Sequence, residues 1–287
     1  MGSRRLDPDV LDRLIDLALA EDIGPGDVTT RALVDPARRG RARIVARERG
    51  VLAGIPVARR LLRRVDPGLR LYQALADGSP VQPGSVVAAV RGPLAPLLTV
   101  ERLLLNVLQR LSGIATQTRR YVDAVAGTGA RVLDTRKTLP GWRALAKYAV
   151  SVGGGQNHRA GLYDQILIKD NHLAAAAATP AEAVAQARAA APRGMRIEVE
   201  VETVRDARAA AAAGADIVML DNMPPRRVKQ AVAAIRQTGR RVIIEASGRV
   251  TLRTIRAVAA TGVDWISVGA LTHSAKALDL SLEVEVD

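Results

Sequence analysis

Basic side chains gather in two stretches near the middle of the chain. The first reads DTRKTLPGWR over 134–143, and the second reads GGGQNHRAGLYDQILIKDNH over 153–172. Arginine suits bidentate contact with carboxylate or phosphate, while lysine acts as a compact point charge. A solvated basic loop is the simpler interpretation, but the glycines at 153–155 allow close backbone approach to a ligand. We therefore expect an anion pocket built from Arg136, Lys137, His158, Arg159, Lys169 and His172.

Carboxylates form a second group further along the chain. Glu198, Glu200 and Glu202 alternate along one apolar run and so share one face of a strand, and Asp221 ends the next run. Glu200 and Asp221 at the ends of neighbouring strands could hold Mg²⁺ or its waters beside a diphosphate. Pairing with nearby cations and general acid–base work are the alternatives. Which of the three glutamates faces the site stays open.

Two glycine-containing turns form a third group, IEASGRV over 244–250 and SVGALTHSAKALD over 267–279. Each turn follows a predicted strand and leads into a helical segment. Barrels of βα units commonly bind phosphate at their last two loops, through backbone N–H groups and a helix N-terminus. The candidate phosphate ligands are Ser247, Gly248, Gly269 and Ala270, with His273 close by.

The elements that must position these groups are short β-branched runs separated by alanine-rich helical stretches. Strands alternating with such helices indicate parallel βα units, and near-continuous apolar strands indicate a sheet covered on both faces. We favour a closed or nearly closed barrel over a doubly wound open sheet. Because barrel active sites lie at the carboxyl ends of strands, we expect one site shared by five charged residues at those ends. These residues are Asp134, Lys169, Glu200, Asp221 and Glu245.

The N-terminal part has a different character. Residues 6–21 predict a helix with Leu6, Leu14 and Leu17 on one face, and residues 41–90 predict a small β-rich α+β unit. From residue 99, helical spacing predicts one long helix or two abutting ones, with Gly113 as a possible kink. We expect an N-terminal domain over 1–115 and a barrel domain over 116–287.

Composition excludes several classes of protein. The chain has 287 residues and no cysteine, which removes disulfides, thiolate metal sites and a cysteine nucleophile. The net charge of +13 could suit a nucleic-acid binder, but the arginines are scattered and only 2% of residues are aromatic. No apolar run reaches the length of a membrane span, and the acidic N-terminal helix does not resemble a signal peptide. We expect a cytoplasmic enzyme that binds neither nucleic acid nor membrane.

These runs together resemble the quinolinate phosphoribosyltransferase family. The match is colinear over almost the whole chain and includes EDIGPGDVTT (21–30), ERLLLNVLQRLSGIAT (101–116), DTRKTLPGWR, GGGQNHRAGLYDQILIKDNH, IEVEVET, VMLDNMPP and IEASG. The resemblance implies an N-terminal α/β sandwich domain followed by an incomplete α/β (TIM-like) barrel. It implies transfer of phosphoribose from phosphoribosyl pyrophosphate to quinolinate with decarboxylation. The products would be nicotinate mononucleotide, CO₂ and pyrophosphate, in de novo NAD biosynthesis with Mg²⁺.

The resemblance also implies a dimer or larger homo-oligomer, in which the partner's N-terminal domain completes each site. Quinolinate would contact Arg136, His158, Arg159 and Lys169, with Arg102 supplied by the neighbouring subunit. Lys137 would face the pyrophosphate, and Glu200 and Asp221 would serve Mg²⁺ and the ribose hydroxyls. The 5′-phosphate would lie against Ser247, Gly248, Gly269 and Ala270, near His273. The implied catalytic residues are Lys137, Lys169, Glu200 and Asp221.

One position departs from the family pattern. A second glycine usually follows the SG pair, and this chain has Arg249 there, which could add a phosphate contact or crowd the loop. The nearest alternative function is the same fold with another acceptor, such as nicotinate, or a paralogue associated with molybdate transport. The complete set of cations favours a dicarboxylate acceptor.

Overall fold

The computed structural model describes residues 6–286, which fall into two compact units. The first unit holds residues up to 119 together with 138–154 and the segment from 271 onward; the second holds 120–137 and 155–270. Residues 138–154 and the C-terminal segment thus pack with the N-terminal part of the chain. Within the described part of the chain, we find no helix with the length and hydropathy of a membrane span.

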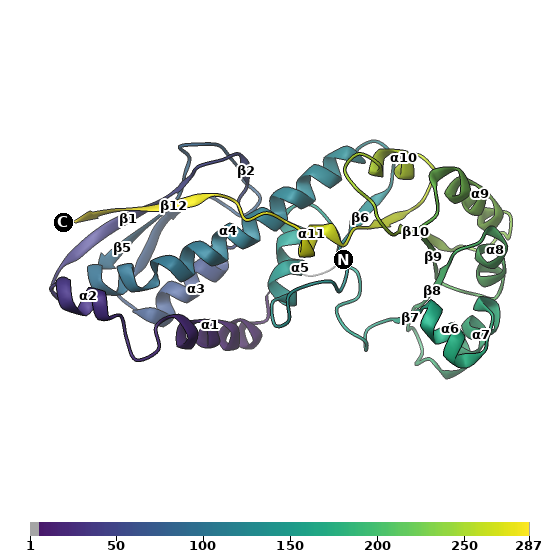
Figure 1. Ribbon diagram of the computed structural model, residues 1–287, viewed down its shortest axis with the longest axis horizontal. Coiled ribbons are helices and arrows are strands. Elements are labelled where there is room, and N and C mark those ends of the chain that lie inside the picture. Colours follow the sequence, from purple (N-terminus) through teal and green to yellow (C-terminus); the bar gives the residue numbers. More distant parts are fainter. Residues whose placement is uncertain (1–5, 287) are drawn as a thin grey trace. The chain divides into compact units, whose positions relative to one another are not determined.

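The first unit is built on a four-stranded antiparallel sheet in the order β12-β1-β5-β3 (Figure 1). In β1 the arginines at 39, 41 and 43 are exposed, whereas Ala42 and Ile44 are buried, as the two-residue period of a half-buried strand requires. The C-terminal strand β12 pairs along the whole of β1. The strands are β1 (Arg39–Ala46), β3 (Arg70–Ala74), β5 (Val86–Pro93) and β12 (Leu280–Val286), with a small ladder of β2 (Gly50–Val51) and β4 (Pro80–Val81).

Helices complete the first unit. Helix α1 begins after Asp7, whose carboxylate accepts the N–H groups of Asp9 and Val10. It buries Leu11 and Ile15, whereas Leu6 and Leu14 of the predicted face are half-buried and Leu17 is 67% exposed. The prediction missed Leu11 and Ile15 because the spacing of the apolar residues fits more than one stripe. The helices are α1 (Pro8–Asp22), α2 (Val28–Leu33), α3 (Ile55–Val65), α4 (Leu94–Ala124), α5 (Arg143–Val152) and α11 (Ala270–His273).

Gly113 lies inside α4, which is one continuous helix of 31 residues. Gly113 therefore does not interrupt the helix. A Cβ atom at this position would lie 2.0 Å from the Lys276 carbonyl oxygen and 3.0 Å from Ala277 Cα. Glycine is required here because the backbone of the C-terminal segment crosses the helix at this point.

We expect Gly113→Ala to destabilise the protein by at least about 2 kcal/mol, because a backbone carbonyl cannot yield as a flexible side chain would. A thermal melt compared with Gln117→Ala, a partly exposed position on the same helix, measures the difference. Equal melting temperatures for the two variants would contradict the crossing.

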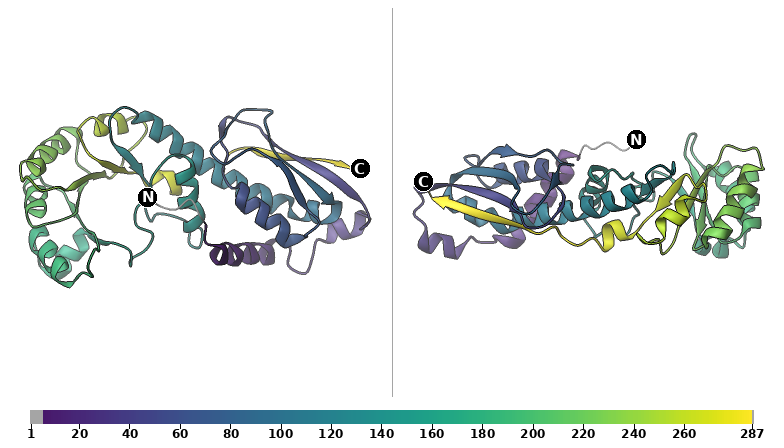
Figure 2. Two further views of the ribbon diagram at one scale, coloured as in Figure 1. Left: turned by 180° about the vertical axis from the view of Figure 1, so that it is seen from behind. Right: turned by 90° about the horizontal axis from the view of Figure 1, so that it is seen from above.

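The second unit is a six-stranded parallel sheet in the order β6-β11-β10-β9-β8-β7. The strands curve into an arc with helices along its outer side (Figure 2). This confirms the predicted incomplete α/β barrel. The strands are β6 (Arg131–Leu133), β7 (Ile166–Ile168), β8 (Ile197–Val201), β9 (Ile217–Asp221), β10 (Ile243–Ser247) and β11 (Trp265–Ser267). The helices are α6 (Asp170–Ala176), α7 (Pro180–Ala190), α8 (Val204–Ala212), α9 (Pro225–Arg236) and α10 (Ile255–Ala259).

Candidate active site

The parallel register brings polar side chains of neighbouring strands to one height. Glu200 of β8 lies beside Met219 of β9, and Asp221 lies beside Ser247 of β10. Since side chains alternate between the two faces of a strand, the members of each pair point to the same side of the sheet. The carboxyl ends of β8 to β10 therefore present acid and hydroxyl groups together.

These groups line a cavity of about 560 Å³ in the second unit. Most of the predicted pocket residues lie along its wall, namely Arg136, Lys137, His158, Arg159, Lys169, Glu200, Asp221, Ser247 and Gly248. Arg249 lines it as well. Sequence reasoning missed Thr135, Leu167, Met219, Asn222 and Ser267. Only the alternation of side chains along a strand could have indicated Met219, which shares a face with Asp221.

Four of the residues that the family resemblance implies are not among the described residues that line the cavity. Gly269 and Ala270 follow β11, at the start of α11. His273 is exposed, and its Nδ1 lies 2.6 Å from the Ser274 hydroxyl. Arg102 is exposed on α4 in the first unit. The roles predicted for these four residues stay predictions.

Two arginines give the cavity a strongly positive wall. Arg159 donates from Nη1 to the Gln165 carbonyl at 3.2 Å, and its buried Nε has no acceptor among the described residues. Burial, and then the charge of Arg136, lower the pKa of Arg159 below its usual range. Two guanidinium groups that raise each other's energy are stabilised by an anion between them, which is the property expected of an anion pocket.

The acidic side of the cavity has the donor set of a magnesium site. Glu200 accepts from Lys169 Nζ at 2.6 Å, and its side chain is 13% exposed. Asp221 accepts from the side-chain amide of Asn222. Mg²⁺ takes oxygen ligands, commonly one or two carboxylates together with substrate phosphates. Glu200 and Asp221 supply oxygen ligands of this kind.

The turn after β10 is tightly packed. Gly248 has φ of 93°, and a Cβ there would lie 2.2 Å from Asn222 Oδ1 and 2.9 Å from Asn222 N. Asn222 and Arg249 both have positive φ, 51° and 44°. Arg249 therefore takes the left-handed backbone conformation, which favours glycine. Glycine is the usual residue at this position in the family that the chain resembles. The Arg249 side chain reaches the cavity wall nevertheless.

Two of the five charged strand-end residues do not line the cavity. Asp134 is buried and accepts the Asn157 amide at 2.6 Å and the His158 N–H at 2.9 Å, so it holds the glycine-rich loop. Glu245 lies within β10 and is fully buried. The prediction of one shared site is therefore right for Lys169, Glu200 and Asp221 and wrong for the other two. Glu245 lies two residues before Ser247 on β10, one repeat of the strand pleat away from the carboxyl end. The sequence does not state the strand register that sets this position.

Two further residues of the basic stretches have structural roles. His172 accepts the backbone N–H of Lys169 at 2.9 Å, which caps α6. A Cβ at Gly153 would lie 2.5 Å from the Ala115 carbonyl oxygen. The close approach that we attributed to a ligand is in this case an approach to helix α4.

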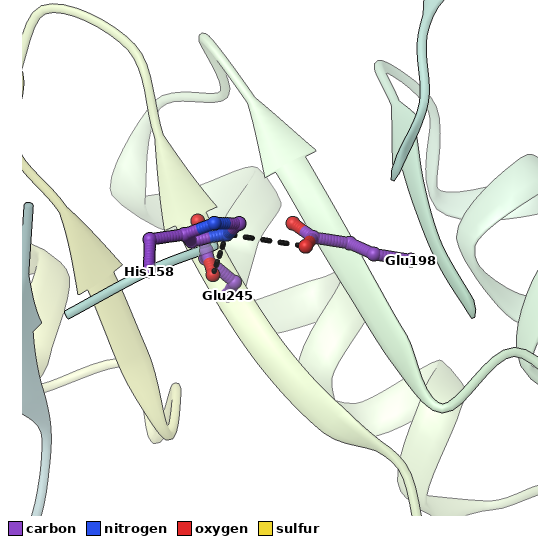
Figure 3. Close-up of side chains that lie close together, drawn as sticks. All are labelled: His158, Glu198 and Glu245. Atoms are coloured by element: carbon purple, nitrogen blue, oxygen red, sulfur yellow. Dashed lines mark ion pairs between the residues drawn. The ribbon is translucent and has the colours of Figure 1, made fainter. Parts of the chain in front are cut away.

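His158 connects the cavity to the buried acids (Figure 3). Its Nε2 lies 3.1 Å from Glu198 Oε2 and 3.4 Å from Glu245 Oε2. Burial alone would lower the pKa of His158, but the hydrogen bonds and charges of Glu198 and Glu245 outweigh it and raise the pKa above its usual range. Burial, followed by the charge of Glu245, raises the pKa of Glu198 to about 7. The protonation states of His158 and Glu198 therefore depend on each other.

Comparison with known proteins gives the same result for both parts of the chain. The family model described as quinolinate phosphoribosyl transferase, N-terminal domain, matches residues 27–112, and that of the C-terminal domain matches residues 114–283. A probable nicotinate-nucleotide pyrophosphorylase [carboxylating] of Synechocystis is 44% identical over 275 residues, covering 96% of this chain and 92% of that protein. The nicotinate-nucleotide pyrophosphorylase of Mycobacterium leprae is 44% identical over 270 residues, covering 93% and 94%.

Solved structures agree with these relatives. The crystal structure of NadC from Streptococcus pyogenes matches with a TM-score of 0.93 and 42% identity, covering 99% of this chain and 100% of that chain. The nicotinate-nucleotide pyrophosphorylase of Francisella tularensis matches with a TM-score of 0.91 and 39% identity, covering 98% of each. Family models, identity and fold coincide over nearly the full length, and this chain belongs to the quinolinate phosphoribosyltransferase family.

Proposed function

We propose that this protein transfers phosphoribose from phosphoribosyl pyrophosphate to the ring nitrogen of quinolinate, and that loss of CO₂ and pyrophosphate gives nicotinate mononucleotide. The observation that carries the proposal is one cavity lined both by two adjacent guanidinium groups and by the carboxylates of Glu200 and Asp221. The cations suit the dianion quinolinate, and the carboxylates suit a metal-bound diphosphate. Both substrates are small molecules.

The quinolinate carboxylates would lie against Arg136 and Arg159, with Lys169 beside them. Fixing the acceptor in one orientation brings its nitrogen to the ribose carbon without further loss of freedom in the transition state. The partly buried setting strengthens each charge-assisted hydrogen bond relative to water. Quinolinate binding would also relieve the repulsion between the two arginines, so the free pocket is poised for a dianion.

The phosphoribosyl half would extend toward the carboxylates and the turn after β10. Glu200 and Asp221 would contact the ribose hydroxyls and hold Mg²⁺. When bound, this ion would neutralise charge on the departing pyrophosphate. Lys137 would face the pyrophosphate, and Ser247, Gly248, Gly269 and Ala270 would hold the 5′-phosphate, with His273 nearby. Stabilisation of charge that develops in the transition state is the main catalytic contribution here.

Decarboxylation places a further demand on the same cations. When the bond to CO₂ breaks, its electron pair would stay on the ring carbon beside the newly cationic nitrogen, which stabilises it until a proton from solvent forms the new C–H bond. Basic side chains orient the departing carboxylate, but tight binding of its anionic ground state would slow its loss. We therefore assign Arg136 and Arg159 mainly to orientation of the ring.

The acceptor is tested by pyrophosphate release from phosphoribosyl pyrophosphate and Mg²⁺ with quinolinate or nicotinate supplied separately. We expect release with quinolinate only. Release with nicotinate and not with quinolinate would keep the phosphoribosyl half of the proposal and overturn the dicarboxylate pocket.

Arg249 provides a second test, since it combines backbone strain with a cation at the cavity wall. We expect Arg249→Gly to raise KM for phosphoribosyl pyrophosphate about tenfold through loss of a phosphate contact. The variant should melt at an equal or higher temperature, because glycine relieves a left-handed strain of about 1 kcal/mol. Arg253→Gly, an exposed arginine of the same loop, controls for the loss of charge. A lower melting temperature with unchanged KM would contradict this role.

A further inference from the structure

Two carboxylates are fully buried behind the wall of the cavity. Glu198 of β8 and Glu245 of β10 are both 0% exposed, and neither is among the described residues that line the cavity. Both approach one atom, Nε2 of His158 (Figure 3). We infer that Glu198 and Glu245 are positioning residues for the acceptor pocket, which hold the imidazole of His158 and, through it, the loop that carries Arg159. The inference rests on the proposed assignment of Arg159 and His158 to quinolinate binding.

The imidazole is held from both sides. Its Nε2 lies 3.1 Å and 3.4 Å from the two carboxylates, and its Nδ1 accepts the backbone N–H of Arg159 at 2.8 Å. The ring therefore connects the buried acids to the backbone of the neighbouring arginine. A shift of the imidazole would move that backbone, and the Arg159 guanidinium would lose its alignment in the pocket.

A divalent metal ion is the competing occupant of this cluster. One ligand atom from each of His158, Glu198 and Glu245 lies within 4.8 Å of the others. A histidine that binds a metal through Nε2 carries its proton on Nδ1 and donates it to an acceptor. Here Nδ1 instead accepts an amide N–H, so the ring proton belongs on Nε2, facing the carboxylates. The geometry favours a hydrogen shared with the acids over a metal ion.

The charge of Glu198 acts on Arg159 as well. Glu198 accepts from the Gln165 side-chain amide, and its charge raises the pKa of Arg159, against burial and Arg136, which lower it. Oε1 of Glu198 and both carboxylate oxygens of Glu245 accept no hydrogen bond from the described residues. A buried carboxylate without donors is costly unless a cation compensates it. The acids and the cationic wall thus stabilise each other before the acceptor binds.

The test uses neutral variants of nearly the same shape. We expect Glu245→Gln to raise KM for quinolinate about tenfold or more, with KM for phosphoribosyl pyrophosphate changed less than about twofold. His158→Ala should raise the same KM, and Glu245→Gln added to His158→Ala should have no further effect, because the acid acts through the imidazole. Glu198→Gln serves as the second acid variant if Glu245→Gln does not fold, as judged by its melting curve. Glu202→Gln, exposed at the end of the same strand as Glu198, is the matched control.

Four outcomes would overturn the inference. Equal changes in both KM values would indicate a general structural role, and additive effects in the His158→Ala background would show that the acid does not act through the ring. One equivalent of divalent metal in the purified protein, lost in Glu245→Gln, would show that the cluster is a metal site. If His158→Ala leaves quinolinate KM unchanged, the proposed pocket assignment fails together with the inference. A change in His158→Ala with an additive acid effect removes the inference alone.

Discussion

Replacing Arg136 with alanine is expected to lower kcat/KM for quinolinate by about a thousandfold, or roughly 4 kcal/mol. Arg136 lines the cavity and lies close enough to Arg159 to depress the pKa of that residue. Removing one member of a charge-assisted pair in a partly buried site costs several times more than removing an exposed ion pair. The binding of phosphoribosyl pyrophosphate, which we assign to the other side of the cavity, should change little.

The matched control is Arg226→Ala, an exposed arginine at the start of α9. It removes the same charge from the second unit without touching the cavity. Steady-state kinetics with each substrate varied in turn provide the comparison. Near-normal kinetics of Arg136→Ala would contradict the assignment of the basic wall to the acceptor.

Mixing two inactive variants is expected to restore activity if subunits share their sites. We propose that Arg102, exposed on α4, completes the pocket of a partner subunit, so Arg102→Ala and Arg136→Ala should each be nearly inactive. In a mixed dimer, which has one subunit of each variant, one site carries both changes and the other carries neither. Remixing in equal amounts should therefore recover about a quarter of wild-type activity.

The controls follow from the same geometry. Each variant unfolded and refolded alone should stay inactive, and light scattering should report a dimer or larger assembly. Failure of the mixture to exceed the separate variants, in a sample that is dimeric, would contradict a shared site and would return Arg102 to a role within its own subunit.

Much of the second unit could be predicted, because each strand is a short apolar run bounded by polar or glycine residues. Lys169, Glu200 and Asp221 were predicted to lie together, since the carboxyl ends of parallel strands meet at one edge. The arrangement of the first unit was harder to predict from the sequence. Strand β12 pairs with β1, a strand from the opposite end of the sequence, and no local pattern states which partner it takes.

Register and packing account for the remaining errors. Glu245 was expected in the shared site, but it lies two residues before the end of β10 and faces the buried side of His158. Ser267 and Met219 carry no chemical signal, and only the fold brings them to the cavity. Gly113 was interpreted from the low helix propensity of glycine. Glycine is needed there because the backbone of a distant segment lies against the helix. Local sequence patterns predicted which residue types form the site. Contacts between distant segments determine which of these residues line the cavity.

The most direct test of the acceptor assignment is the ratio of CO₂ to pyrophosphate formed from quinolinate labelled in the carboxylate next to the ring nitrogen. The proposed reaction predicts one labelled CO₂ for each pyrophosphate, with nicotinate mononucleotide as the product. Pyrophosphate release without labelled CO₂ would contradict the decarboxylating transfer and assign the cavity to a different acceptor.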